Sequence, residues 1–242
     1  MTFSENQLFE HLLDANLNRE SPESMAQWFR GFQSYTSPSM TSVDRATVGG
    51  RHSSNLAFSF AAGYQSAIES IFNLASPTVS STTDASAAGS TPTLSSFCVS
   101  EEKGNHPRAI ATGLTAVDGG YVLNGNKSFV SGGCDAQQLF IACKVAETAS
   151  GTPELKMVSL PANYQGIEIT AMPELPFIPE IKHGQLRFEQ VFIEPEQLLE
   201  GDGYTHYIKP FRSYEDVHVS AAVCGFRLGE ALNANWDKAF IE

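Results

Sequence analysis

The sequence predicts an α+β fold with an N-terminal helical domain, a middle antiparallel β-barrel-like domain and a long C-terminal helix. Three observations predict it. Apolar residues recur every three or four positions before residue 75, they alternate with polar residues in short runs between about 97 and 199, and they return to helical spacing from about 207. We therefore expect three parts, at residues 1–92, 93–203 and 204–242.

Three helices are expected in the first part. Ser4 and Gln7 have the spacing of a capping box before the first helix. Ser21 followed by Pro22 is typical of an N-cap and first-turn proline before the second. The third helix, at about 53–74, is apolar on more than one side, which indicates that it is buried.

The segment 75–96 is rich in serine, threonine and alanine and has almost no large apolar side chains. Such a composition buries little surface, so we expect a linker or surface loop. Period-two runs follow, separated by turn signals such as Asn124-Gly125 and Gly132-Gly133. They predict strands at 109–117, 121–123, 139–145, 155–160, 167–171 and 185–193. Regular spacing without intervening helices favours an antiparallel barrel or sandwich.

The last helix is apolar around most of its circumference. One stripe recurs at intervals of four and three residues, and other apolar residues lie on the remaining faces. The stripe consists of Val217, Ala221, Cys224, Leu228 and Ala231. Such a helix needs cover on several sides, from the N-terminal helices or from another subunit. We therefore expect self-association as a dimer or larger oligomer.

Composition excludes some classes of function. The chain has 15 basic and 27 acidic residues, a net charge of -12, which argues against binding to nucleic acid or an anionic membrane. It shows neither a run of about 18 apolar residues nor a basic-then-apolar leader. The four cysteines form no CxxC pair and the six histidines show no ligand spacing, so we expect a cytoplasmic protein with free thiols and no metal.

Four ordered motifs resemble those of the acyl-CoA dehydrogenase family. The segment 97–101 (FCVSE) is similar to the family's strand before "TEP", and 118–127 (DGGYVLNGNK) is similar to its "NGxK" hairpin. The segment 128–133 (SFVSGG) occupies the place of "x-[WF]-I-T-N-G". The segment 188–201, FEQVFIEP followed by LLEG, resembles the family's later strand end. The chain is identified as a shortened member that lacks most of the C-terminal helical domain.

The resemblance implies an FAD site on the middle domain. Val99 and Ser100 match the first flavin-contacting strand of the family, and Phe129 and Ser131 match the second. The residue types suit this role, because a hydroxyl can hydrogen-bond near flavin N5 and an aromatic ring can cover the flavin face. In the alternative interpretation, the two serines only end strands and Phe129 is a core residue.

The loop after Glu101 departs from the family pattern. The family has a glycine- and serine-containing turn that approaches the cofactor phosphate, whereas this chain has 102–107 (EKGNHP), without a matching serine. Lys103, His106 and Arg108 are candidate phosphate partners that compensate for it. Alternatively they are ordinary solvated charges.

The resemblance also identifies a candidate base. Some branches of the family place the catalytic carboxylate early in the helix that follows the middle domain, and Glu215 stands there. The adjacent Asp216 replaces an arginine of the family pattern. Glu215 would take the alpha proton of an acyl thioester while the beta hydride leaves for the flavin. In the alternative, both residues form an acidic first turn that the helix dipole favours.

Three hypotheses of function follow. The first is an FAD-dependent oxidoreductase acting on acyl-CoA or a related small molecule. The second is a non-catalytic relative that has lost the flavin and serves as a binding or assembly protein. The altered 102–107 loop, Asp216 and the missing C-terminal helices favour this second hypothesis. The enzyme is favoured by the matched Ser100, Phe129, Ser131 and Glu215. The third is an unrelated β protein.

Overall fold

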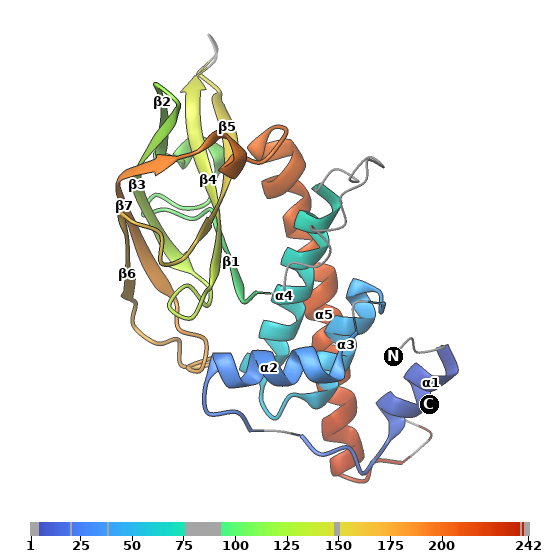
Figure 1. Cartoon of the computed structure of the whole chain (residues 1–242). Helices are drawn as coiled ribbons and strands as arrows, with labels where there is room; N and C mark the ends of the chain where they lie inside the picture. Colours follow the sequence, from blue (N-terminus) through green and yellow to red (C-terminus); the bar gives the residue numbers. More distant parts are fainter. Residues whose placement is uncertain are drawn as a thin grey trace. The chain divides into compact units, whose positions relative to one another are not determined.

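The computed structural model describes residues 5–19, 21–37, 39–75, 93–147, 151–237 and 239. Four helices precede a curled sheet, and a long helix follows it (Figure 1). The chain forms two compact units. The helical unit comprises Met1–Ser70, Glu174–Ile181 and Arg212–Glu242, and the β unit comprises Ile71–Pro173 and Lys182–Phe211. This confirms the predicted α+β fold, while the division into three domains stays a prediction.

The helices are close to those predicted, with one addition. Their bounds are α1 Glu5–Leu13, α2 Met25–Tyr35, α3 Ser42–His52, α4 Leu56–Ala75 and α5 Lys209–Asn233. Ser4 of the predicted capping box lies outside the described residues. The N-cap of α2 is Ser24, whose hydroxyl accepts from the Gln27 N–H, so the prediction of Ser21 was wrong. The helix begins where Met25, its first buried apolar residue, turns into the helical unit.

Helix α3 was missed because its sequence contains two glycines and few apolar residues. The glycines serve packing within the helical unit. A Cβ atom on Gly50 would lie 1.8 Å from the carbonyl oxygen of Ala222 in α5, and a Cβ atom on Gly225 would lie 2.1 Å from the carbonyl oxygen of Thr47. Helices α3 and α5 therefore approach backbone to backbone, which residues with a Cβ atom at these positions would prevent.

The buried face of α5 agrees with the predicted stripe only in part. Ala231 is buried, but Val217 and Cys224 are exposed, and a row of small residues and one histidine is buried instead. That row consists of His218, Ala222, Gly225 and Gly229. Glycine is not counted as an apolar residue in a helical pattern, so the pattern did not indicate this packing face.

The sheet has seven strands among the described residues. They are β1 Ser95–Cys98, β2 Gly113–Val117, β3 Gly120–Val130, β4 Gln138–Glu147, β5 Pro153–Pro161, β6 Ile167–Ala171 and β7 Gly184–Ile193. The strand order is β1-β4-β2-β3-β7-β6, and β5 pairs with β4. Most pairs are antiparallel, but β1 and β2 both pair with β4 in parallel. The sheet is therefore mixed. Residues 118–119 connect β2 and β3 in a hairpin, whereas Asn124-Gly125, predicted as a turn, lies inside β3 at a register shift, so that turn prediction was wrong.

Two strand predictions need correction. The run 109–117 is a strand only from Gly113, because Pro107–Ala109 forms a 3-10 turn capped by His106. Leu94 is buried, and Ser95 and Ser96 are the buried first residues of β1, so the end of the predicted 75–96 linker is wrong. Residues 76–92 of that linker lie outside the described part of the chain.

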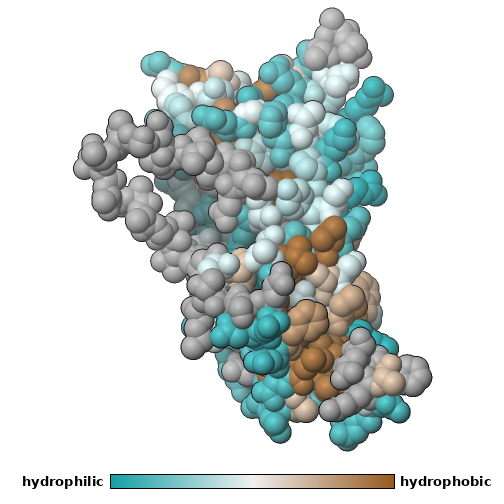
Figure 2. Space-filling view, turned by 90° about the vertical axis from the view of Figure 1, so that its right-hand side faces the viewer, coloured by the Kyte–Doolittle hydropathy of each residue, from teal (hydrophilic) through white to brown (hydrophobic). Residues whose placement is uncertain are grey.

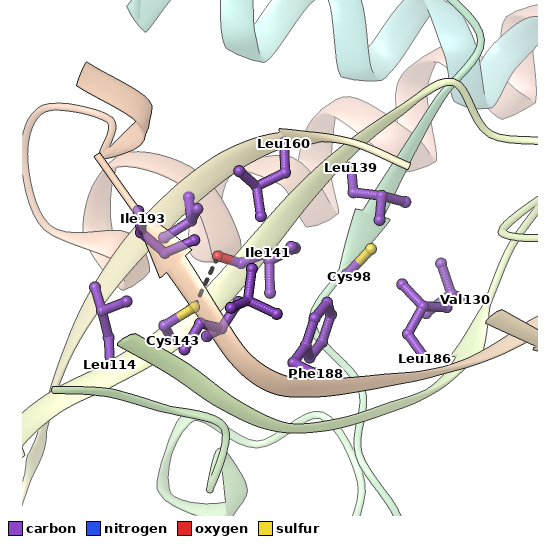
Figure 3. Packing of buried hydrophobic residues seen from close by; sticks show 13 residues of the cluster. Cys98, Leu114, Val130, Leu139, Ile141, Cys143, Leu160, Leu186, Phe188 and Ile193 are labelled. Atoms are coloured by element: carbon purple, nitrogen blue, oxygen red, sulfur yellow. Dashed lines mark hydrogen bonds between the residues drawn. The ribbon is translucent and has the colours of Figure 1, made fainter. Parts of the chain in front are cut away.

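The β unit has its own apolar core, shown in Figure 3, where side chains from several strands point toward one another. Its members are Cys98, Leu114, Leu123, Val130, Leu139, Ile141, Cys143, Val158, Leu160, Leu186, Phe188, Val191 and Ile193. Burial raises the pKa of the Cys98 and Cys143 thiols to about 12. Both thiols therefore stay protonated, and all four cysteines are free, as predicted.

No helix in the described ranges is both long and apolar enough to cross a membrane. Across the same ranges, no group of three or more histidine, cysteine, aspartate or glutamate side chains is placed to hold a metal ion.

Candidate functional site

The four residues predicted to contact a flavin lie on two neighbouring segments of the β unit. Val99 and Ser100 follow β1, while Phe129 and Ser131 lie at the end of β3. The Ser128 N–H donates a hydrogen bond to the Ser100 carbonyl at 2.9 Å. Both segments therefore run side by side, and the structure brings together residues about 30 positions apart in the sequence.

Phe129 is presented to the outside of the β unit by an irregularity in β3. The β3–β7 register shifts between Lys127 and Val130, and Phe129 has a positive φ of 55°. Its ring is 60% exposed, and its N–H contacts the Met172 sulfur at 3.2 Å. A bulge of this kind changes the direction of a side chain. The left-handed backbone conformation costs about 1 kcal/mol for a residue other than glycine. Phe129 is therefore an exposed aromatic platform, and the interpretation as a core residue is wrong.

Both the backbone carbonyl and the side-chain hydroxyl of Ser131 have hydrogen-bond partners. Its carbonyl accepts a hydrogen bond from the Ser96 hydroxyl at 2.8 Å. Its own hydroxyl lies 3.3 Å from Nε2 of His183, a residue that is only 8% exposed. The serine is half-buried, and so is Ser100. Two half-buried serines thus lie close to Phe129 in the two neighbouring segments.

A buried ion pair supports these segments from inside. Nζ of Lys127 lies 2.8 Å from Oε1 of Glu101 and 3.2 Å from the Val99 carbonyl. The Glu101 carboxylate also accepts from the Ala111 and Thr112 N–H groups and from the Thr112 hydroxyl. Burial alone would raise the pKa of Glu101, but Lys127 and these hydrogen bonds lower it. The pair therefore fixes the segment that carries Val99 and Ser100 to β3.

The loop at 102–107 forms a tight turn closed on itself. Glu101 and Gly104 exchange backbone hydrogen bonds of 3.0 and 2.8 Å, and Gly104 has a φ of 103°. The side chains of Lys103, His106 and Arg108 are exposed. The ring of His106 accepts from the Arg108 N–H at 3.2 Å. Cations are present here, but the N–H groups of Glu101 and Gly104 are already used within the turn.

Glu215 belongs to the helical unit. Its carboxyl group is half-buried, and burial followed by the charge of Asp216 raises its pKa. Helix α5 begins at Lys209 and continues a π-helical turn at Gly203–Ile208, so Glu215 is not in a first turn. The interpretation as an acidic first turn is therefore wrong. A carboxylate with a raised pKa is a stronger base than an ordinary glutamate.

Sequence reasoning missed several residues that build the site. Ser96 and His183 gave no motif signal, because each acts through Ser131 and comes from a separate segment. Lys127 and Glu101 were visible in the motifs, but nothing in the sequence indicated that their side chains pair. Met172 became identifiable only from the fold.

The order of helices, curled sheet and long helix defines the acyl-CoA dehydrogenase-like fold. Residues 96–191 match the family model described as "Acyl-CoA dehydrogenase, middle domain". This match confirms the resemblance seen in the motifs, and the hypothesis of an unrelated β protein is wrong. A comparison with curated proteins found no match.

Solved structures show the same fold. A structure of PigA with FAD and proline matches with a TM-score of 0.68 and 14% identity, covering 94% of this chain and 66% of that chain. An FAD-dependent dehydrogenase matches with a TM-score of 0.69 and 17% identity, covering 95% and 66%. Butyryl-CoA dehydrogenase from Megasphaera elsdenii matches with 0.61 and 13%, covering 92% and 57%. The chain thus spans between 57% and 66% of the length of these structures, less than two thirds in each case.

Proposed function

We propose that this chain is an FAD-dependent oxidoreductase of the acyl-CoA dehydrogenase type. The observation that carries the proposal is Phe129, an exposed aromatic ring on a strained backbone between two serine hydroxyls. A protein rarely maintains such a conformation without a functional reason. Among the matching structures, PigA is bound to FAD and another protein is an FAD-dependent dehydrogenase.

The residues of the β unit fit a flavin. The ring of Phe129 would cover part of its flat surface, and Val99 would line the same segment. The hydroxyls of Ser100 and Ser131 would hydrogen-bond to its polar edge, since a hydroxyl both donates and accepts. Lys103, His106 and Arg108 would supply positive charge for the phosphates. Bound FAD would supply the hydride acceptor of the reaction.

Glu215 is the proposed base. Its carboxylate would take the proton alpha to the carbonyl of an acyl thioester, and its raised pKa helps it to hold that proton. The hydride would leave the beta carbon in the same reaction. An acyl-CoA is the proposed substrate class, in line with the butyryl-CoA dehydrogenase among the matching structures.

The non-catalytic hypothesis rests on one specific observation. The 101–104 turn is closed by its own backbone hydrogen bonds and is followed by no serine, so it offers less to a phosphate than the family's turn. In this alternative the fold is retained as a binding or assembly protein. Failure to bind FAD would favour this second function.

We also propose that the protein self-associates. Large apolar side chains of the helical unit, among them Phe9, Val217 and Trp236, are exposed. Figure 2 shows hydrophobic side chains gathered over the helical elements. Patches of this kind mark association surfaces. Sedimentation velocity is expected to show a dimer or larger species, and a monomer would contradict it.

The free thiols further support a cytoplasmic location.

The catalytic part is tested by mixing the FAD-loaded protein with acyl-CoA substrates of several chain lengths without oxygen. Bleaching of the flavin absorbance is expected with at least one substrate. Glu215→Gln should abolish bleaching but retain FAD, whereas Glu230→Gln, on the exposed surface of the same helix, should bleach normally. Bleaching by Glu215→Gln at the normal rate would rule out Glu215 as the base.

A further inference from the structure

His183 occupies a position from which it can control the Ser131 hydroxyl. It directly precedes β7, and the next residue, Gly184, pairs with both Val130 of β3 and Ala171 of β6. The His183 carbonyl accepts from the Met172 N–H at 2.9 Å and from the Cys134 thiol at 3.5 Å. The backbone of His183 is therefore fixed at the junction of three strands.

The fixed backbone directs the imidazole ring toward the proposed flavin site. Nε2 of His183 lies 3.3 Å from the Ser131 hydroxyl, and only 8% of the histidine surface is exposed. A free serine hydroxyl rotates among three staggered positions, whereas a hydroxyl bonded to a buried ring is restricted. Ser96 holds the Ser131 backbone through its carbonyl, and His183 restricts rotation of the Ser131 hydroxyl.

We propose that His183 is a positioning residue for the flavin site, which acts by orienting the Ser131 hydroxyl. This inference rests on the proposed function. In this proposal His183 acts through Ser131 and not by contact with the flavin. The bond to the ring uses one of the three hydrogen-bonding positions of the hydroxyl and fixes the direction of the others, so its orientation is set before binding and costs less on binding.

Binding of FAD in a double-mutant cycle tests the proposal. His183→Met, which has no hydrogen-bonding nitrogen, is expected to raise the FAD dissociation constant about fivefold, the effect of one net hydrogen bond. His183→Gln, whose amide nitrogen can replace Nε2, should restore most of the affinity. In a Ser131→Ala background, His183→Met should have no further effect. His206→Gln, an exposed histidine of the β unit, is the matched control.

A purely structural role of His183 would give a different result. An equal loss of affinity in both backgrounds would overturn the proposal, because packing does not depend on the Ser131 hydroxyl. Should His183→Met fail to fold, Ser131→Ala alone decides, since unchanged FAD affinity overturns the proposal and a fivefold or larger loss supports it.

The midpoint potential of bound FAD provides a second readout. A hydroxyl oriented by His183 differs in its interaction with oxidised and reduced flavin, so His183→Met should shift the potential and His183→Gln should shift it less. Wild-type protein that binds no FAD would overturn both the proposed function and this inference. If the wild-type protein binds FAD and His183→Met changes neither the midpoint potential nor the FAD affinity, the inference alone is overturned.

Discussion

Nζ of Lys127 lies 2.8 Å from Oε1 of Glu101, and the lysine side chain has no exposed surface. Both residues come from sequence motifs of the family's middle domain, at the ends of the two segments that carry Ser100 and Phe129. An ion pair buried in this way is stabilising only when both partners are present, since the loss of one leaves an unpaired charge.

We therefore predict that Lys127→Met lowers the free energy of unfolding by about 3 kcal/mol. Urea denaturation measures the effect. Lys144→Met removes a lysine that pairs with Glu147 at the surface, and it should cost less than about 1 kcal/mol. Equal losses in the two variants would contradict the structural role of the buried pair.

The stability of the helical unit should depend on pH through His52. Its Nε2 lies 3.0 Å from Nε2 of His11. Burial, then His11, then Arg51 lower the pKa of His52 to about 4 from an ordinary value of 6.5. Between these values the unfolded chain binds the proton and the folded chain does not, so stability falls as the pH falls from 6.5 toward 4.

Replacing His52 by glutamine should reduce this loss of stability. Urea denaturation of His52→Gln at pH 7 and at pH 4.5 is expected to give a smaller difference than the wild type. His206→Gln, an exposed histidine, should leave the difference unchanged. A pH dependence of His52→Gln as steep as that of wild type would contradict the assignment.

Phe129→Gly should separate ligand binding from stability. Glycine adopts a positive φ freely, which offsets the entropy that it adds to the unfolded chain, so the free energy of unfolding should change by less than about 1 kcal/mol. FAD affinity should fall about fivefold, because the aromatic contact is lost. Gln190→Gly, at a φ of 49°, is the control and should keep FAD affinity. Unchanged affinity in Phe129→Gly would refute the platform role.

The approach of α3 to α5 predicts that Gly50→Ala is destabilising. The added Cβ atom would meet the Ala222 carbonyl, and the resulting overpacking should cost about 2 kcal/mol despite the better helix propensity of alanine. At Gly229 the nearest atom to an added Cβ atom is Nη1 of Arg51, at 3.1 Å, compared with 1.8 Å at Gly50. Gly229→Ala should therefore cost clearly less than Gly50→Ala in thermal unfolding, and similar losses in both variants would contradict the close approach.

The sequence predicted the fold well where residue patterns depend on large side chains. The β2–β3 hairpin and the long helix α5 follow from alternation and helical spacing. The prediction failed for α3, whose Gly49-Gly50 resembles a turn signal although it allows two backbones to approach. It also failed at Ser95 and Ser96, because a buried strand that begins with small polar residues has the composition of a loop.

The candidate site was predictable only in part. The motifs identified Ser100, Phe129 and Ser131, because those positions are tied to short sequence patterns. The partner of Ser131, His183, lies 52 positions away and depends on the pairing of β7 with β3. Sequence spacing does not reveal a contact between strands that are far apart in the chain, so this contact became visible only in the structure.

The central claim is that the β unit carries a flavin site, and an FAD titration of the purified full chain, followed by flavin absorbance and fluorescence, tests it most directly. Wild-type protein is expected to bind one FAD per chain, and Ser100→Ala/Ser131→Ala should bind at least tenfold more weakly, as expected for two lost hydrogen bonds. Thr115→Ala, an exposed position on β2, should bind like wild type. A wild-type chain that is colourless and does not respond to added FAD would contradict the claim and favour the non-catalytic function.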